Sequence, residues 1–203
     1  KETKFEDKGI YFETTDMVKD FIKMVEEYKP DLIGLSAVEL TFNMGMKLVN
    51  AVSSIMPDIM VIVGGSHALT SPELVIREKN VDIVCMGEAE NAFIDLCKKL
   101  KNKEDYSGIL NLWIKKDGQI FKNKLGNLIN IDDIPYQDWE IFDKRRIYKP
   151  MSGTIGRTGC FELTRGCVYS CTFCINEFLN KVYNHKSYRE KSIPKFIDEV
   201  KHF

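Results

Sequence analysis

The sequence has no excess charge of either sign and no long apolar run. Its 29 lysines and arginines stand against 30 aspartates and glutamates, which gives a formal net charge of −1 at pH 7. A balanced charge supplies no overall basic field, which argues against nucleic acid as a partner. The longest uninterrupted apolar run covers residues 59–63. A membrane-spanning helix needs about 20 such residues, so we expect no membrane anchor.

The first residues contain neither an initiating methionine nor the apolar core of a secretion signal. We therefore expect a cytoplasmic protein, and a fragment of a longer one. The length of 203 residues fits one complete domain and part of another, at about 150 residues per domain. Without a secretory route, the six cysteines are expected to be thiols or metal ligands rather than disulfides.

Residues 15–100 alternate amphipathic helices with short apolar strands, and residues 1–105 are expected to share one α/β fold. The expected strands lie at residues 32–35, 59–63 and 83–86. Single helices between the strands predict right-handed crossovers, and hence a doubly wound parallel sheet in a three-layer α/β fold. Ser71 and Pro72 predict the N-cap and first turn of another short helix.

Beyond the third expected strand, Asp117-Gly118 between two apolar segments predicts a hairpin that extends the sheet or caps its edge. We expect residues 1–125 to form one domain that includes this hairpin. Residues 126–159, rich in proline and glycine, are expected to be a linker docked by Trp139 and Phe142. Residues 160–203 would begin a second domain with one strand, one long loop and one helix.

Three of the cysteines have the spacing C-x3-C-x2-C, namely Cys167, Cys171 and Cys174. Three thiolates in one short loop can converge on an iron or zinc centre. No fourth cysteine is close by, which leaves an open coordination position for a ligand. The other cysteines are interpreted as packing residues. They are Cys85, Cys97 and Cys160, the last on the expected strand before the loop.

The segment 162–174, ELTRGCVYSCTFC, resembles the cluster loop of radical S-adenosylmethionine (SAM) enzymes. The resemblance implies that Cys167, Cys171 and Cys174 hold a 4Fe–4S cluster whose fourth iron binds the amino and carboxylate groups of SAM. One electron then splits the sulfonium into methionine and a 5′-deoxyadenosyl radical. Phe173, before the third cysteine, would flank the adenine. Val168 departs from the Pro or Asn frequently found after the first cysteine.

Upstream segments resemble the subset of this family that carries an N-terminal cobalamin-binding domain. Residues 30–36 (PDLIGLS), 63–67 (VGGSH) and 86–90 (MGEAE) are similar to three successive strand ends of that domain. Residues 131–135 are similar to its linker, and residues 188–192 to the end of the cluster loop. The start of a radical SAM β/α barrel is thus expected after the cobalamin-binding domain.

This resemblance implies an enzyme that uses SAM, a 4Fe–4S cluster and cobalamin to methylate or rearrange an unactivated carbon. It also implies an external electron donor as a partner. The substrate, a small molecule or a peptide, would be selected by barrel strands outside this chain. We therefore expect the chain alone to be inactive.

The residues themselves also favour a ligand site at the sheet. Carboxyl ends of parallel strands form the edge where open α/β sheets bind ligands. The residues expected there are Ser36, Gly64, Gly65, Gly87 and Glu88. Glycines let a large planar ligand approach the backbone, so Gly65→Val is expected to block cobalamin while the sheet stays folded. Structural interpretations stay open: a helix cap for Ser36, turns for the glycines, and a helix-dipole partner for Glu88.

Histidines give little support for an axial cobalamin ligand, because no Asp-x-His-x-x-Gly motif is present. His67 follows the double glycine, and either approaches a corrin edge or, as we favour, is a packed loop residue. His185 and His202 are expected to face solvent.

Two other functions remain open. The α/β domain could be a scaffold that binds no cobalamin in a radical SAM enzyme. Alternatively, Cys167, Cys171, Cys174 and His185 could hold zinc in an interaction module, since three thiolates and an imidazole satisfy tetrahedral zinc. A nucleotide-binding role is disfavoured because the sequence has no G-x-G-x-x-G motif.

Overall fold

The computed structural model describes residues 3–11, 15–184 and 187–203 of the chain. The chain falls into two compact units. Thr15–Ile129 contains the main sheet and is called the sheet unit below. The second unit, called the cysteine unit, joins Lys1–Thr14 to Asn130–Phe203. Residues 1–14 and 130–159, which the sequence assigned to the first domain and the linker, thus group with the three cysteines.

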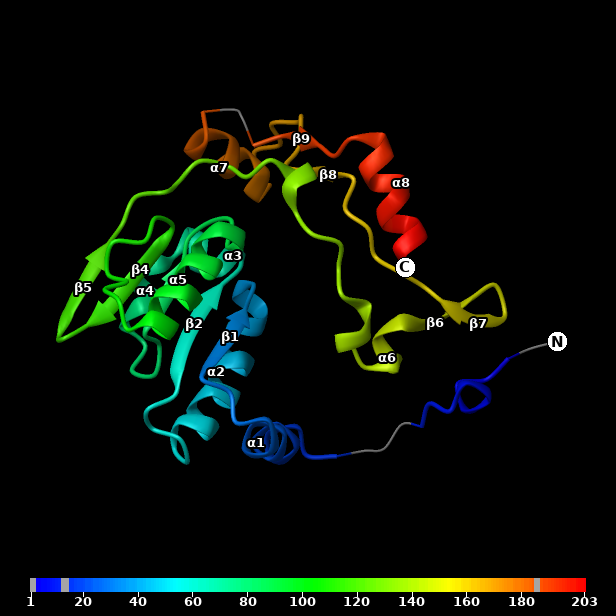
Figure 1. Cartoon of the computed structure of the whole chain (residues 1–203), viewed down its shortest axis with the longest axis horizontal. Helices are drawn as coiled ribbons and strands as arrows, with labels where there is room; N and C mark the ends of the chain where they lie inside the picture. The colour runs from blue at the N-terminus through cyan, green and yellow to red at the C-terminus, as the bar shows by residue number, and fades with distance from the viewer. Residues whose placement is uncertain (1–2, 12–14, 185–186) are drawn as a thin grey trace. The chain divides into compact units, whose positions relative to one another are not determined.

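Five strands of the sheet unit form one mixed sheet in the order β1-β2-β3-β4-β5 (Figure 1). Strands β1 to β3 are parallel, and β4 and β5 form an antiparallel hairpin at the edge. The α/β prediction is confirmed, although the sheet is mixed rather than wholly parallel. The strands are β1 (Leu32–Ser36), β2 (Met60–Gly64), β3 (Ile83–Cys85), β4 (Leu112–Lys116) and β5 (Gln119–Lys122).

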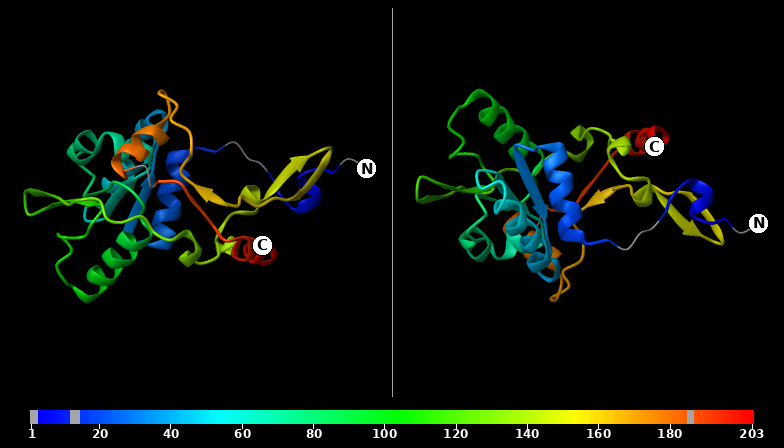
Figure 2. Two further views of the ribbon diagram at one scale, coloured as in Figure 1. Left: turned by 90° about the horizontal axis from the view of Figure 1, so that it is seen from above. Right: turned by 90° about the horizontal axis from the view of Figure 1, so that it is seen from below.

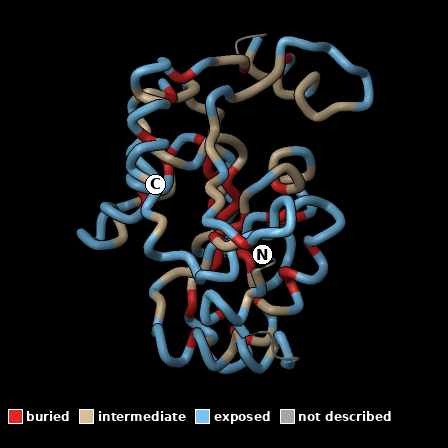
Figure 3. The backbone as a smooth tube through the Cα atoms, turned by 90° about the vertical axis from the view of Figure 1, so that its right-hand side faces the viewer, coloured by how far each residue is buried: buried red, intermediate tan, exposed pale blue. Residues whose placement is uncertain are grey.

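Helices cover both faces of this sheet (Figure 2). Neighbouring residues of a strand point to opposite faces. Val61 and Val63 accordingly pack with the core beneath α1 to α4, and Ile62 packs with the core beneath α5. Most of β2 and all of β3 are buried (Figure 3). The helices are α1 (Met17–Tyr28), α2 (Glu39–Ser53), α3 (Ser66–Thr70), α4 (Pro72–Arg77) and α5 (Glu90–Asn102).

The predicted hairpin turn is confirmed. Asp117 and Gly118 have φ angles of 52° and 74°, the left-handed values that a type I′ turn requires. The Ser71 prediction is confirmed only in part. Pro72 opens α4 as expected, but the Ser71 side chain makes no capping hydrogen bond. Asp16 does cap its helix, since its Oδ1 accepts the N–H groups of Val18 and Lys19 at the start of α1.

In the part of the chain that the structure describes, the cysteine unit contains two small two-stranded sheets and three α-helices. The pair β6 (Tyr148–Met151) and β7 (Thr154–Arg157) is antiparallel, as is the pair β8 (Thr164–Arg165) and β9 (Arg189–Glu190). The helices are α6 (Lys144–Ile147), α7 (Ile175–Val182) and α8 (Ile193–His202). Single 3-10 turns cover Glu6–Lys8, Ile131–Asp133 and Trp139–Ile141.

Two expectations for this part of the chain were wrong. The segment interpreted as an irregular linker contains the β6–β7 hairpin. The strand expected at Cys160 is only the two-residue β8, which starts at Thr164 and pairs antiparallel with β9. Barrel strands run parallel, so the start of a β/α barrel is not seen in the described residues.

Candidate cofactor sites

The carboxyl ends of β1, β2 and β3 meet at one edge of the sheet, as the sequence predicts. Ser36 and Gly64 end their strands side by side in the β1–β2 register. Both Ser36 and Gly65 are exposed, and Gly64 is half-buried. Gly87 and Glu88 follow β3 and are half-buried. The structure therefore brings the predicted residues to one edge, and leaves backbone there open to a ligand.

The backbone conformation and the close packing at position 65 require a glycine there. Its φ is +90°, and a Cβ at this position would lie 2.5 Å from the Ala37 carbonyl oxygen and 2.8 Å from the Ala37 nitrogen. The backbone of the β2–α3 loop thus touches the backbone that leaves β1. A valine side chain would collide with Ala37 whether or not a ligand is bound, so we expect Gly65→Val to strain this loop as well as to block cobalamin.

Glu88 is engaged with its own unit. Its Oε2 accepts the Ile129 N–H at 2.8 Å, and its backbone carbonyl accepts the Asn111 side-chain amide at 2.8 Å. The Asn111 Oδ1 in turn accepts the Gly126 N–H at 2.7 Å. Glu88 and the buried Asn111 therefore fix the chain that leaves the hairpin. Sequence reasoning missed Asn111, whose one signal is a polar residue directly before an apolar strand.

His67 is packed, as expected, but it lies on the short helix α3 and not in a loop. Its ring lies 4.6 Å from the Phe42 ring at a tilt of 46°. Its backbone N–H donates to the Ala37 carbonyl at 3.2 Å. Of the two other histidines, the structure tests the prediction for only one. His202 is exposed, as expected, and its ring lies 5.2 Å from that of Tyr136. His185 lies outside the described residues.

Apolar side chains at the same edge were not predicted from the sequence. Leu40 is 94% exposed and Val38 is 48% exposed, both just after β1. A corrin ring is broad and flat, with amide groups on its rim, so it needs apolar surface beside hydrogen-bonding backbone. Exposed Ser36 and Gly65 backbone next to Val38 and Leu40 supplies both kinds of contact. The residue types at this edge therefore fit cobalamin.

The three-cysteine loop has its two ends joined. Thr164 pairs with Glu190 and Arg165 with Arg189 in the β8–β9 ladder. Gly166, just before the first cysteine, has a φ of +84°, and a Cβ there would overlap the Ser187 carbonyl group. The two ends of the loop are thus in backbone contact. Only glycine fits this position without a shift of the backbone.

The thiols within the loop differ in exposure. Cys171 is exposed, whereas Cys167 and Cys174 are half-buried, and the Cys174 N–H donates to the Cys171 carbonyl at 3.0 Å. Among residues 3–11, 15–184 and 187–203, no three Cys, His, Asp or Glu side chains are grouped closely enough to hold a metal ion. A four-iron cube keeps its cysteine ligands farther apart than a single ion does. Three soft thiols in one closed loop therefore fit a cluster by their chemistry.

The side chains between the three cysteines are exposed. Phe173 is 92% exposed, and Tyr169 and Val168 are 70% and 65% exposed. Outside the loop, Cys85 is buried, and burial raises the pKa of its thiol to about 11. That packing prediction is confirmed. It was wrong for Cys97 and Cys160, which are both exposed.

The segment similar to a linker docks on the last helix. Asp132 Oδ1 accepts the Ser192 N–H at 2.8 Å at the start of α8, and Ile131 is buried. Trp139 packs on Phe203, with ring centroids 4.7 Å apart. These contacts hold the segment on the element that follows the cysteine loop.

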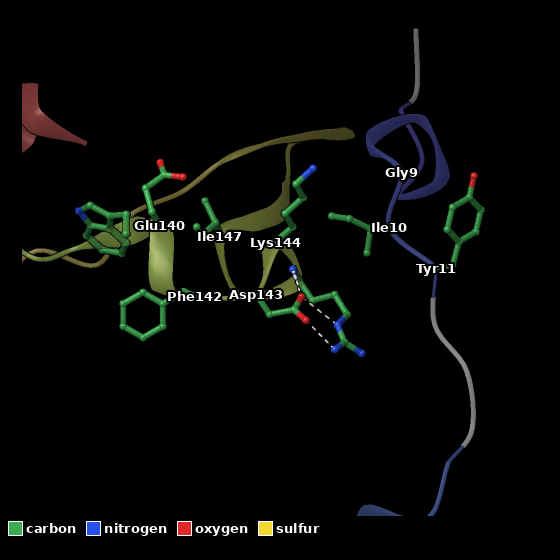
Figure 4. Close-up of a pocket in the computed structure, with 10 residues that line it drawn as sticks. Gly9, Ile10, Tyr11, Glu140, Phe142, Asp143, Lys144 and Ile147 are labelled. Atoms are coloured by element: carbon green, nitrogen blue, oxygen red, sulfur yellow. Dashed lines mark hydrogen bonds and ion pairs between the residues drawn. The ribbon is translucent and has the colours of Figure 1, made fainter. Parts of the chain in front are cut away.

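The cysteine unit also has a cavity of about 550 Å³ away from the three cysteines. Residues 9–11 form one wall and residues 139–147 the other (Figure 4). Arg145 in it is paired with Asp143 through bonds of 2.6 to 2.9 Å, and this ion pair lowers the pKa of Asp143 to about 2. Asp143 thus engages two of the nitrogens of the Arg145 guanidinium group.

No helix of the described residues is long and apolar enough to cross a membrane.

Comparison with known proteins assigns the fold. Residues 5–97 match the family model of the B12 binding domain. Among solved structures, the chain is similar to the cobalamin-dependent S-adenosylmethionine radical enzyme OxsB with aqua-cobalamin bound, with a TM-score of 0.70 and 22% identity. The match covers 91% of this chain and 25% of OxsB. The chain is also similar to the radical S-adenosylmethionine methyltransferase TsrM from Kitasatospora setae, with a TM-score of 0.63 and 16% identity. That match covers 97% of this chain and 40% of TsrM. At these identities the likeness shows the fold.

Curated relatives extend the likeness along the chain. The uncharacterized methyltransferase PH0819 of Pyrococcus horikoshii is 27% identical over 183 residues, a match that covers 89% of this chain and 38% of the relative. The cytidylyl-2-hydroxyethylphosphonate methyltransferase of Streptomyces wedmorensis is 23% identical over 211 residues, with the same two shares. The chain therefore spans 38% of the length of both relatives.

Residues 5–97 thus match the B12 binding domain, and the chain has an α/β fold like that of OxsB. The resemblance to the N-terminal part of a cobalamin-dependent radical SAM enzyme is confirmed.

Proposed function

We propose that this chain is the cofactor-binding N-terminal part of a radical SAM methyltransferase that uses both a 4Fe–4S cluster and cobalamin. The observation that carries the proposal is the closed loop with three thiols on the same chain as a B12-binding domain. Methyl transfer is favoured over rearrangement because the relatives PH0819 and cytidylyl-2-hydroxyethylphosphonate methyltransferase both bear that activity in their names.

When bound, the cluster would supply one electron to SAM and the cobalamin would carry a methyl group. Cys167, Cys171 and Cys174 would hold three irons and leave the fourth iron for SAM. Phe173, exposed beside the third cysteine, would cover the adenine. Its aromatic face needs a partner that removes it from water, and a purine ring is one.

At the sheet edge, Ser36, Gly64, Gly65 and Gly87 would offer backbone to the corrin amides. Exposed Leu40 would lie against the flat ring. Glu88 would act indirectly, because its carboxylate holds Ile129. An external electron donor completes the reaction. The substrate, a small molecule or a peptide, would be bound by parts of the enzyme outside this chain. This fits the match to PH0819, which covers 38% of that relative.

A second candidate keeps the cluster but leaves the sheet unit without cobalamin. The contacts of Gly65 with Ala37 and of Glu88 with Ile129 favour it, because they give two predicted ligand-contact residues structural roles. A zinc module with His185 as fourth ligand is a third candidate, and that histidine lies outside the described residues.

Anaerobic reconstitution of the chain with iron and sulfide tests the cluster. We expect about four irons per chain and the spectrum of a 4Fe–4S cluster, with loss of both in Cys171→Ala. Cys160→Ala is the matched control, because Cys160 is also exposed and lies outside the spaced set. Stoichiometric zinc without visible absorbance would overturn the proposal, and so would equal iron in the two variants.

A further inference from the structure

Helix α7 begins directly after the third cysteine and carries two amide side chains, Asn176 and Asn180. They are four residues apart, so they lie on the same face of the helix. The Asn176 side-chain amide donates to the Cys174 sulfur at 3.6 Å, a normal distance for an acceptor as large as sulfur. The Asn180 amide donates to the Cys167 carbonyl at 3.4 Å. One helix face thus contacts the first and the third cysteine.

The Asn180 contact is part of a buried network. Asn180 is 5% exposed and Ser187 is 4% exposed. The Ser187 hydroxyl donates to Asn180 Oδ1, which leaves the Asn180 amide for Cys167. Burying an amide and a hydroxyl is costly unless they are paired, so this network fixes the helix against both ends of the loop. Asn180 therefore orients the helix face on which Asn176 meets the sulfur.

Apolar residues would serve packing alone better at these positions. Asparagine is a poor helix former, and each buried amide needs partners. A thiolate that ligates iron carries negative charge, and an N–H bond to it stabilises the reduced, more negative cluster. Outer contacts of this kind tune a metal centre as well as hold its ligands.

We propose that Asn176 tunes the reduction potential of the cluster through its bond to Cys174, and that Asn180 with Ser187 positions it to do so. This inference rests on the proposed function, because it requires a cluster on the three cysteines. Asn176 is a positioning and tuning residue, and it does not touch SAM.

The test is a redox titration of the reconstituted chain, followed by electron paramagnetic resonance of the reduced cluster. Asn176→Leu keeps the side-chain size and removes the donor. We expect its equilibrium constant for cluster reduction to fall about three- to tenfold, where tenfold corresponds to 59 mV for one electron. Asn176→Gln, which keeps a donor, should lie close to the wild type. Asn176→Asp, which adds negative charge instead, should lie below Asn176→Leu.

A purely structural Asn176 would not produce this order of potentials. Equal potentials in the wild type, Asn176→Leu and Asn176→Asp would overturn the inference while the proposed function stands. If Asn176→Leu loses its iron, the comparison of Asn176→Gln with Asn176→Asp decides, because both resemble the native residue in polarity. A wild-type chain that takes up no 4Fe–4S cluster would overturn the inference together with the proposed function.

Discussion

At the scale of single residues, Gly65 shows how a ligand-site pattern can serve the fold. We expect Gly65→Ala to destabilise the sheet unit by at least about 2 kcal/mol, because φ is +90° and the new Cβ would meet Ala37. Urea unfolding followed by Trp113 fluorescence in a Trp139→Phe background measures this. Gly64→Ala is the control, since its nearest neighbour would be Cys85 Cβ at 3.8 Å. Equal stability of the two variants would refute the structural role of Gly65.

Cys85 predicts a pH dependence. Burial raises the pKa of its thiol from 9.0 to about 11. The unfolded chain therefore loses this proton at lower pH than the native chain, and stability is full below pH 9.0 and falls as pH rises towards 11. At 1.36 kcal/mol per pKa unit, the full loss amounts to about 3 kcal/mol.

Urea unfolding at a series of pH values checks this prediction. Cys85→Ala should remove that part of the alkaline loss, although it lowers stability at every pH by leaving space in the core. Cys97→Ser, at an exposed cysteine, should keep the wild-type profile. An unchanged alkaline slope in Cys85→Ala would contradict the account.

The spacing of Cys167, Cys171 and Cys174 could be read from the sequence because it is local along the chain. The partners of Glu88 could not, since Ile129 is 41 residues away and is brought close by the fold. Asn176 and Asn180 were missed for a related reason. The sequence placed both in one long loop, and the helix α7 that brings them to the cysteines was not predicted.

At the scale of elements, a buried ion pair joins the end of the cysteine loop to α8. Lys191 and Glu199 are bonded to each other, with side chains only 5% and 6% exposed. The Lys191 N–H also donates to the Leu163 carbonyl at 2.8 Å. Glu199→Gln leaves a buried lysine charge without its partner, so we expect a loss of about 3 kcal/mol in the cysteine unit.

Unfolding of the cysteine unit can be followed through Trp139 in a Trp113→Phe background, because the chain has two tryptophans. The double variant Lys191→Met with Glu199→Leu should recover most of the stability, since it removes both charges together. A double variant as unstable as Glu199→Gln would show that packing, and not the ion pair, sets the stability.

Strands β2 and β3 were predictable because buried parallel strands are continuous apolar runs, and β1, which is only partly buried, carries a similar apolar run. The β6–β7 hairpin was not, because its strands are largely exposed and contain Pro150. Its turn does carry a local signal in Ser152-Gly153, with φ angles of 48° and 77°. Because this hairpin buries little surface, its strands lack the alternation of apolar and polar residues that would have predicted them.

At the scale of the whole molecule, the chain combines two compact units with different chemistry. The sheet unit presents a strand edge with exposed backbone and apolar side chains, and the cysteine unit presents three thiols in a closed loop. In the proposed function, each unit would supply the residues for one cofactor. The central claim is therefore that the chain binds cobalamin at the sheet edge as well as a cluster at the cysteines.

Binding of hydroxocobalamin to the chain, followed by absorbance after gel filtration, tests this claim most directly. Ser36 and Asp31 are both exposed and lie at opposite ends of β1, so a tryptophan at either should leave the sheet folded. We predict about one cobalamin per wild-type chain, retention in Asp31→Trp, and loss in Ser36→Trp by steric exclusion. No cobalamin on the wild-type chain, or equal retention by the two variants, would contradict the account.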